Sequence, residues 1–148
     1  MTDLDTITAF NELIETSKDG ERNFRAAAEE AYHPELKSFL KDRAQDCARS
    51  AQELQDAVRA LGGRPEEIGT TGATVRRGWM HLKALALGRD EIAILDECER
   101  YEDAVEARYE HALGVEMPDR MHALVERQYE GMRQHHSEMR GMRERFAH

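Results

Sequence analysis

Residues 7–28 read ITAFNELIETSKDGERNFRAAA, and the spacing of apolar residues in this stretch decides the fold. Ile7, Phe10, Ile14 and Phe24 recur at the intervals of three and four residues that place side chains on one face of a helix. Glu21 lies in the same apolar stripe. The pattern therefore predicts a long amphipathic helix that carries a carboxylate on its core-facing side.

A second stretch, residues 90–114, repeats this pattern as DEIAILDECERYEDAVEARYEHALG. When Glu21 is aligned with Glu102, other core-type positions also coincide, such as Ile14 with Leu95. Chance likeness between amphipathic helices is common, but a glutamate at the same place in two apolar stripes is a stronger sign of duplication. The sequence therefore predicts two related helical hairpins.

Breaks in the periodic pattern divide the chain into these hairpins and a long connection. His33-Pro34 separates the first two helices, Gly62-Gly63 ends the second, and Pro118 opens the last. The predicted units are a hairpin over 4–61, a crossover over 62–89 and a hairpin over 90–146, within one domain, 1–148. Helices of this length span about 40 Å, so a long crossover suits a connection between opposite ends of a bundle. We expect an all-α fold: an up-down-down-up, ferritin-like four-helix bundle whose crossover contains a short helix.

The crossover has its own amphipathic segment, TVRRGWMHLKALALG, at residues 74–88. Val75, Trp79 and Leu82 share one face of this predicted helix. That face either covers the bundle or forms a contact between two copies of the chain. A homo-oligomer, in the simplest case a dimer, is the partner that we expect.

Composition and charge argue against several classes of partner. The chain has 40% hydrophobic and 34% charged residues, which is typical of a soluble helical protein. A net charge of −9, with Lys and Arg dispersed among acidic residues, opposes binding to nucleic acid. The first residues lack the pattern of a secretory signal, and no stretch approaches the roughly 18 apolar residues of a membrane span. We therefore expect a cytoplasmic protein without a membrane partner, in which Cys47 and Cys98 are reduced.

The candidate metal ligands are polar residues predicted near the middle of the bundle. Depth counted from the two hairpin turns puts eight residues in one layer: Glu21, Asp46, Cys47, Ser50, Glu102, Glu130, Met132 and His135. Carboxylates and imidazoles suit iron or manganese, and a ferritin-like di-iron centre combines single glutamates from two helices with Glu-x-x-His from the other two. The corresponding positions here read Cys47-Ala-Arg-Ser50 and Met132-Arg-Gln-His135. The layer therefore lacks both bridging glutamates.

Three interpretations of this layer remain open: a di-metal centre, a single-metal site and a metal-free polar layer. The predicted ligands of a metal are Glu21, Glu102 and His135, with Asp46 or Glu130. When the Glu-x-x-His motif is instead sought at neighbouring positions, the sequence reads Asp46-x-x-Arg49 and Glu130-x-x-Arg133. These spacings favour pairing of acids with arginines.

The adjacent histidines His135 and His136 point about 100° apart on a helix, so both cannot face the core. We expect His135 to point inward and His136 to lie at the surface. The residues suggest neither a catalytic set nor an organic cofactor site, and iron or manganese is the cofactor only if the metal interpretation holds.

Four segments together resemble a bacterial family of ferritin-like four-helix-bundle proteins that is catalogued as a domain of unknown function. They are LIETSKDGERNF (13–24), SAQELQDAVRALGGRPEE (50–67), RRGWMHLKALALGRDEIAILDECERYEDAVEARYEHAL (76–113) and ALVERQYEGMRQHHSEMRGMR (123–143). The most specific motifs are KDG, LGG.PE, RGWM.LK and AIL.ECER.ED. The resemblance implies a ferritin-like fold and a cytosolic bacterial protein, and it supplies no catalytic residues.

Two functions are therefore expected for this chain. The first is a non-enzymatic bundle protein with a structural or stress-related role, whose central layer is a degenerate metal site. The alternative is a carboxylate-rich protein that binds iron or manganese and has an oxidase-like or metal-handling activity.

Overall fold

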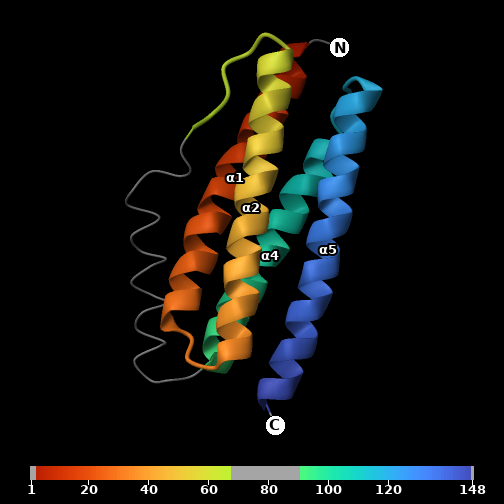
Figure 1. The fold of residues 1–148 in the computed structure, drawn as a ribbon. Coiled ribbons are helices and arrows are strands. Elements are labelled where there is room, and N and C mark those ends of the chain that lie inside the picture. The colour runs from red at the N-terminus through yellow and green to blue at the C-terminus, as the bar shows by residue number, and fades with distance from the viewer. Residues whose placement is uncertain (1–2, 68–90, 148) are drawn as a thin grey trace.

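A computed structural model describes residues 3–67 and 91–147. This part of the chain forms four helices and no strand (Figure 1). The helices are α1 (Asp3–Glu30), α2 (Pro34–Ala60), α4 (Glu91–Leu113) and α5 (Asp119–Ala147). The predicted all-α four-helix bundle is confirmed. No described helix combines the length and the apolar character that a membrane crossing requires.

The four helices pair as two antiparallel hairpins, α1 with α2 and α4 with α5 (Figure 1). Helix α4 begins beside the α1–α2 turn, where the Glu91 carboxylate accepts hydrogen bonds from the backbone N–H groups of Tyr32 and His33 at 2.7 and 3.0 Å. Helix α2 ends at the opposite end of the bundle (Figure 1). Helices α2 and α4 are therefore parallel, and the four directions follow the up-down-down-up order.

One sequence prediction concerns the segment that connects α2 to α4. The expected short helix, with its face of Val75, Trp79 and Leu82, lies outside the described residues. The prediction of an interface at this face therefore stays a prediction.

The apolar core consists of two clusters stacked along the bundle. One lies toward the α1–α2 turn and includes Phe24, Leu40 and Leu95. The other lies toward the far end and includes Phe10 and Leu54. Burial of each large apolar side chain stabilises the fold by about 1.5–3 kcal/mol relative to exposure, before the opposing loss of conformational entropy. Tyr101 packs against both clusters, and the next residue on α4, Glu102, is buried.

Gly20, the glycine of the KDG motif, lies where three helices approach closely. A Cβ atom at this position would be only 2.8 Å from the Cys47 sulfur on α2 and 2.8 Å from the Tyr101 hydroxyl on α4. That hydroxyl donates a hydrogen bond to the carbonyl oxygen of Thr16 on α1. Glycine normally weakens a helix, but here it allows the backbone of α1 to contact its neighbours.

The LGGRPE stretch that follows α2 turns the chain back across α1. Gly62 adopts a φ of 81°, in the left-handed region that glycine enters without a Cβ penalty. Asn11 on α1 then accepts a hydrogen bond from the backbone N–H of Glu66 at 2.8 Å and donates one to the carbonyl oxygen of Arg64. Gln55 on α2 donates to the carbonyl oxygen of Glu66. The stretch is thereby attached to both helices of the first hairpin.

Candidate functional site

The centre of the bundle holds a buried ion pair between α2 and α4. Nη2 of Arg43 donates a hydrogen bond to Oε1 of Glu102 at 2.6 Å, and the two side chains are only 6% and 1% exposed. The guanidinium also lies 4.9 Å from the centroid of the Phe24 ring, where it makes a cation–π contact. Burial is the largest single influence on the pKa of Arg43 and lowers it. The charge and the hydrogen bond of Glu102, with smaller contributions from Cys47 and Tyr101, together outweigh burial and raise the pKa, so the guanidinium stays charged.

This pair explains how a glutamate is accommodated within an apolar stripe. A buried carboxylate without a cation costs several kcal/mol, and Arg43 offsets that cost. The hydrogen bonding of the pair is incomplete, however. Oε2 of Glu102 and Nε of Arg43 are buried and have no hydrogen-bond partner among the described residues. The pair is therefore neutral overall but keeps one unmatched acceptor and one unmatched donor.

A second acid extends the pair toward α5. Asp46 lies 3.6 Å from Nη1 of Arg43, and its Oδ2 lies 3.0 Å from Nε2 of His135. Asp46 also pairs with Arg49 on its own helix, which agrees with the acid–arginine pairing expected for that spacing. Burial and the charge of Arg43 lower the pKa of His135. The lowered pKa favours the neutral form of the His135 imidazole at neutral pH.

A cavity of about 360 Å³ adjoins the ion pair, and all four described helices contribute to its lining. The exposed side chains of Arg49 and Arg127 belong to its rim. This volume is within the range of small-molecule sites. Inside, the Tyr109 hydroxyl donates to the Gln128 carbonyl oxygen at 2.8 Å, and the Gln128 amide donates to Glu53. Much of the polar lining is therefore already hydrogen-bonded within the protein.

The two thiols near this layer are poor nucleophiles. Burial raises the pKa of Cys47 and of Cys98 to about 12, because a thiolate is disfavoured away from water. Burial likewise raises the pKa of Tyr101 and of Tyr109. At neutral pH all four groups keep their protons and act as hydrogen-bonding or packing groups.

The structure brings some of the predicted metal ligands together and separates others. Asp46, Glu102 and His135 all line the central cavity. Glu21 instead pairs with Arg25 on its own helix at 3.0 Å and is not among the lining residues. Glu130 is exposed on α5.

The residues of this layer do not suit the iron or manganese centre that a ferritin-like fold implies. Such a centre surrounds its ions with several carboxylates, one of them at the position of Glu102. Here Oε1 of Glu102 bonds the Arg43 guanidinium, whose positive charge opposes a metal cation at the same place. The layer is better matched to acid–arginine pairing.

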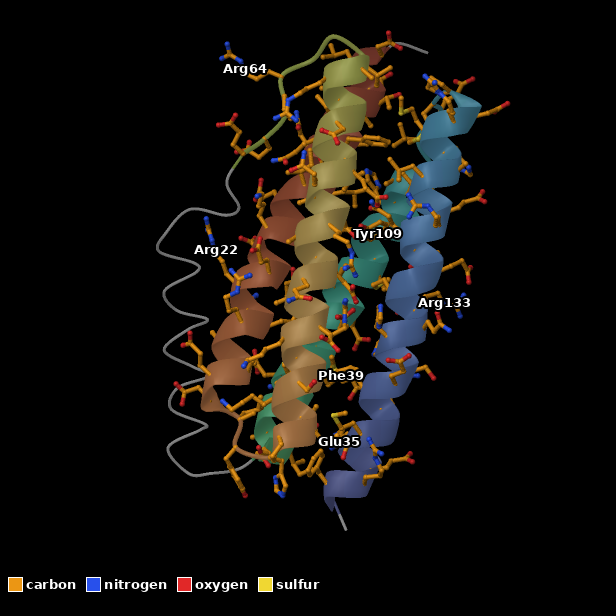
Figure 2. All side chains as sticks on the ribbon, viewed as in Figure 1. Arg22, Glu35, Phe39, Arg64, Tyr109 and Arg133 are labelled. Atoms are coloured by element: carbon orange, nitrogen blue, oxygen red, sulfur yellow. The ribbon has the colours of Figure 1, made fainter. Side chains whose placement is uncertain are left out.

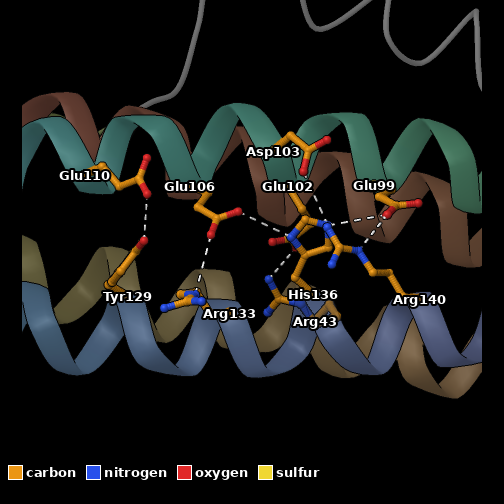
Figure 3. A network of polar contacts seen from close by, with 10 residues as sticks. All are labelled: Arg43, Glu99, Glu102, Asp103, Glu106, Glu110, Tyr129, Arg133, His136 and Arg140. Carbon is orange, nitrogen blue, oxygen red and sulfur yellow. Dashed lines mark hydrogen bonds and ion pairs between the residues drawn. The ribbon is translucent and has the colours of Figure 1, made fainter.

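A second polar cluster lies between α4 and α5 (Figure 3). Its residues are not among the metal ligands that the sequence predicts. Glu99, Asp103 and Glu106 lie along one face of α4, and His136 of α5 projects toward them. His136 is only 4% exposed, so the expectation that it lies at the surface is wrong. Its neighbour His135 is partly buried and faces α2, because consecutive helical residues point in different directions.

The imidazole of His136 has a carboxylate near each of its nitrogens. Nε2 lies 3.4 Å from Asp103 and 3.7 Å from Glu99, and Nδ1 lies 3.6 Å from Glu106. Nε2 is buried and lacks a hydrogen-bond partner among the described residues. Donor atoms of Asp103, Glu106 and His136 all lie within 4.8 Å of one another, the spacing of a potential metal-ion site. We call these four residues the α4–α5 cluster.

Two arginines of α5 flank the α4–α5 cluster. Arg140 lies 3.0 Å from Glu99, and Arg133 lies 3.6 Å from Glu106 (Figure 3). Arg133 points away from the bundle, whereas Tyr109 is turned into its interior (Figure 2). The only sequence signal for the cluster is the spacing of three acids by four and three residues, which is also typical of an ordinary solvated helix face.

Comparison with known proteins identifies the family of the chain. No curated protein matches it. The match to a family model covers residues 5–114, from near the start of α1 to the end of α4, and does not include α5 with His135 and His136. The chain belongs to the family described as Domain of unknown function (DUF2383).

Proposed function

We propose that this protein is a non-enzymatic, ferritin-like bundle protein with a structural or stress-related role in the cytoplasm. The observation that supports this proposal is the Arg43–Glu102 pair in the central layer. Two free cysteines are compatible with a reducing compartment. The central layer is, on this proposal, a degenerate metal site in which a guanidinium supplies the positive charge.

The physical argument rests on what Glu102 needs once it is buried. A carboxylate with 1% of its side chain exposed requires a compensating cation. Arg43 provides that cation from α2, which lies diagonally across the bundle from α4, at hydrogen-bonding distance and without an exchangeable ion. The same guanidinium removes the affinity of this layer for Fe²⁺ or Mn²⁺, and with it the redox chemistry of a di-iron bundle.

Anaerobic titration with Fe²⁺ tests the proposal. Chelator-treated protein should show no iron binding that depends on the central layer, so Glu102→Gln and the Glu21→Ala/Glu102→Ala double variant should titrate like the wild type. An oxygen pulse should then give no protein-dependent oxidation. Stoichiometric iron uptake that disappears in the Glu102→Gln protein, with its helicity unchanged, would overturn the proposal.

Self-association is the second part of the proposal. Its support is the amphipathic segment at residues 74–88, with Val75, Trp79 and Leu82 on one face. Light scattering coupled to size exclusion should give a dimer for the wild type and a smaller species for Trp79→Ala, with unchanged helicity. A wild-type monomer would contradict this part, and an unfolded Trp79→Ala protein would show that Trp79 is a core residue.

Metal handling is the second candidate function, and the α4–α5 cluster is the observation that favours it. The cluster lies outside the central layer and does not use Glu21, Glu102 or His135. Metal binding there is compatible with an ion pair at the centre, so the two candidates can be tested separately.

A further inference from the structure

We propose that the α4–α5 cluster is a binding site for a first-row divalent metal ion of the Zn²⁺ type. His136, Asp103 and Glu106 are the protein ligands, and Glu99 is the carboxylate available beside them. The site does not depend on the Arg43–Glu102 pair, so its test is independent of the proposed non-enzymatic role.

The distances around His136 fit a coordination sphere better than a set of hydrogen bonds. Hydrogen bonds between nitrogen and oxygen usually measure about 2.7–3.2 Å, and all three contacts of the ring exceed this range, at 3.4, 3.6 and 3.7 Å. Metal bonds of about 2.0–2.2 Å in a tetrahedral site separate neighbouring ligand atoms by roughly 3.4 Å. The two nitrogens of one imidazole cannot bind the same ion, so the candidate ligands are one ring nitrogen of His136 and one oxygen each of Asp103 and Glu106, atoms that all lie within 4.8 Å of one another.

Burial of the imidazole supplies the second argument. An unpartnered polar atom in the interior costs free energy, and Nε2 of His136 is such an atom among the described residues. Binding of an ion to one ring nitrogen leaves the other free to donate its proton to a nearby carboxylate, which fixes the ring. With the ion at Nδ1, on the side of Glu106, the carboxylate that can accept this proton is Glu99, 3.7 Å from Nε2 (Figure 3).

The charges around the cluster also favour a cation. Three carboxylates face the ring, and among the described residues two guanidiniums, those of Arg133 and Arg140, pair with them. The local charge is therefore negative when the imidazole is neutral. Asp103, whose side chain is 60% exposed, has room to move toward an ion.

The type of donor narrows the choice of metal. One imidazole nitrogen with carboxylate oxygens suits Zn²⁺ and its first-row neighbours better than Ca²⁺ or Mg²⁺, which prefer oxygen ligands alone. The site lies at the seam of two helices with one exposed ligand, so solvent can complete the coordination sphere. Zn²⁺ is the probe of choice because it has no redox chemistry.

Isothermal titration of chelator-treated, full-length protein with Zn²⁺ tests the site. We expect one equivalent to bind to the wild type, and a loss of at least about tenfold in affinity for His136→Gln and for Asp103→Asn. Asp103→Asn is the decisive variant if the buried His136→Gln change impairs folding. The matched control is His122→Gln, which removes a histidine of the same helix that pairs with a single acid, Glu126. This control should keep the wild-type affinity.

The opposite change should strengthen binding. Arg140 neutralises Glu99 at 3.0 Å, and Arg140→Gln both frees this carboxylate and removes a positive charge near the ion. We expect the affinity for Zn²⁺ to rise by roughly threefold to tenfold at low salt. A merely nonspecific association of Zn²⁺ with surface acids would not single out one arginine in this way.

Three outcomes would overturn the site. The first is a wild-type protein without saturable 1:1 binding of Zn²⁺. The second is binding that survives both His136→Gln and Asp103→Asn. The third is binding that is lost in a folded Glu102→Gln protein but kept in the two cluster variants, which would move the metal to the central layer and would contradict the proposed function as well.

Discussion

Replacement of Arg43 by methionine keeps much of the volume of the side chain and removes its charge, which leaves Glu102 buried without a cation. In the wild type, Oε1 of Glu102 bonds Arg43 at 2.6 Å and Oε2 has no partner among the described residues. The substitution therefore leaves neither oxygen paired. Removal of one partner from a buried ion pair typically costs about 3–5 kcal/mol, and we expect a loss of that size in the free energy of unfolding.

Urea denaturation followed by far-UV circular dichroism at pH 7 measures this loss. With a slope of about 2 kcal/mol per M of urea, a loss of 3–5 kcal/mol lowers the midpoint by roughly 1.5–2.5 M. Arg49→Met is the matched control, because Arg49 is 71% exposed and pairs with Asp46 at the surface. An exposed pair of this kind contributes less than about 1 kcal/mol, so the midpoint of the control should hardly change.

The double variant Arg43→Met/Glu102→Leu separates the interaction of the pair from the cost of burying each group. Replacement of both charges by apolar groups of similar size is often neutral, so the double variant should lie within about 1 kcal/mol of the wild type. Two results would refute the reasoning. One is a loss of less than about 1 kcal/mol in the free energy of unfolding of Arg43→Met, with an unchanged dependence on urea concentration. The other is a double variant whose loss equals the sum of the losses of the two single variants.

Three other predictions concern the packing, the acid stability and the thiols. Gly20→Ala should lower the free energy of unfolding by about 1–2 kcal/mol, because its Cβ would be 2.8 Å from a sulfur and from a hydroxyl oxygen. Gly141→Ala, with no atom within 4 Å of its Cβ, should instead stabilise by about 0.5–1 kcal/mol, and equal effects at both sites would contradict the packing argument. Burial opposes the charge of Glu91, but hydrogen bonds from the α1–α2 turn outweigh it and lower its pKa below the ordinary 4.5, so its contribution is present above pH 4.5 and is lost as the pH falls. Glu91→Gln should therefore flatten the loss of stability below pH 4.5 in urea titrations, and an unchanged pH profile would disprove this role. Burial raises the pKa of the partly exposed Cys47 and of the buried Cys98 to about 12, so both should react slowly with a thiol reagent at pH 8 and quickly in urea, whereas fast reaction of the folded protein would contradict the raised pKa values.

The helices and their order could be predicted from the sequence because their signals are local. Pro34 at the start of α2 and Gly62 just beyond its end act through their own backbone preferences. The apolar stripe of α1 identifies Phe10, Ile14 and Phe24 as buried, and the structure confirms all three. These properties depend on residues within a few positions of one another, so they do not require knowledge of the other helices.

The partner of Glu102 is a different kind of property, because it comes from another helix. The sequence predicts a polar layer at the depth of Cys47 in the bundle, with candidate metal ligands in that layer. Arg43 lies one turn away on α2, and its long side chain reaches Glu102 on α4. Spacing along one helix cannot indicate such a contact, which depends on how the helices pack together in the bundle.

Local sequence patterns predict an all-α four-helix bundle and a glutamate in the apolar stripe of α4, and the structure confirms the bundle and the burial of this glutamate. The tertiary structure decided that Arg43 pairs with this glutamate, and that His136, not His135, is the more buried histidine, beside the acids of α4. The physical reason is that periodicity fixes which residues share a helix face, whereas packing fixes the rotation of each helix. Adjacent residues differ by about 100° around the axis, so a modest rotation of α5 decides which histidine meets which helix.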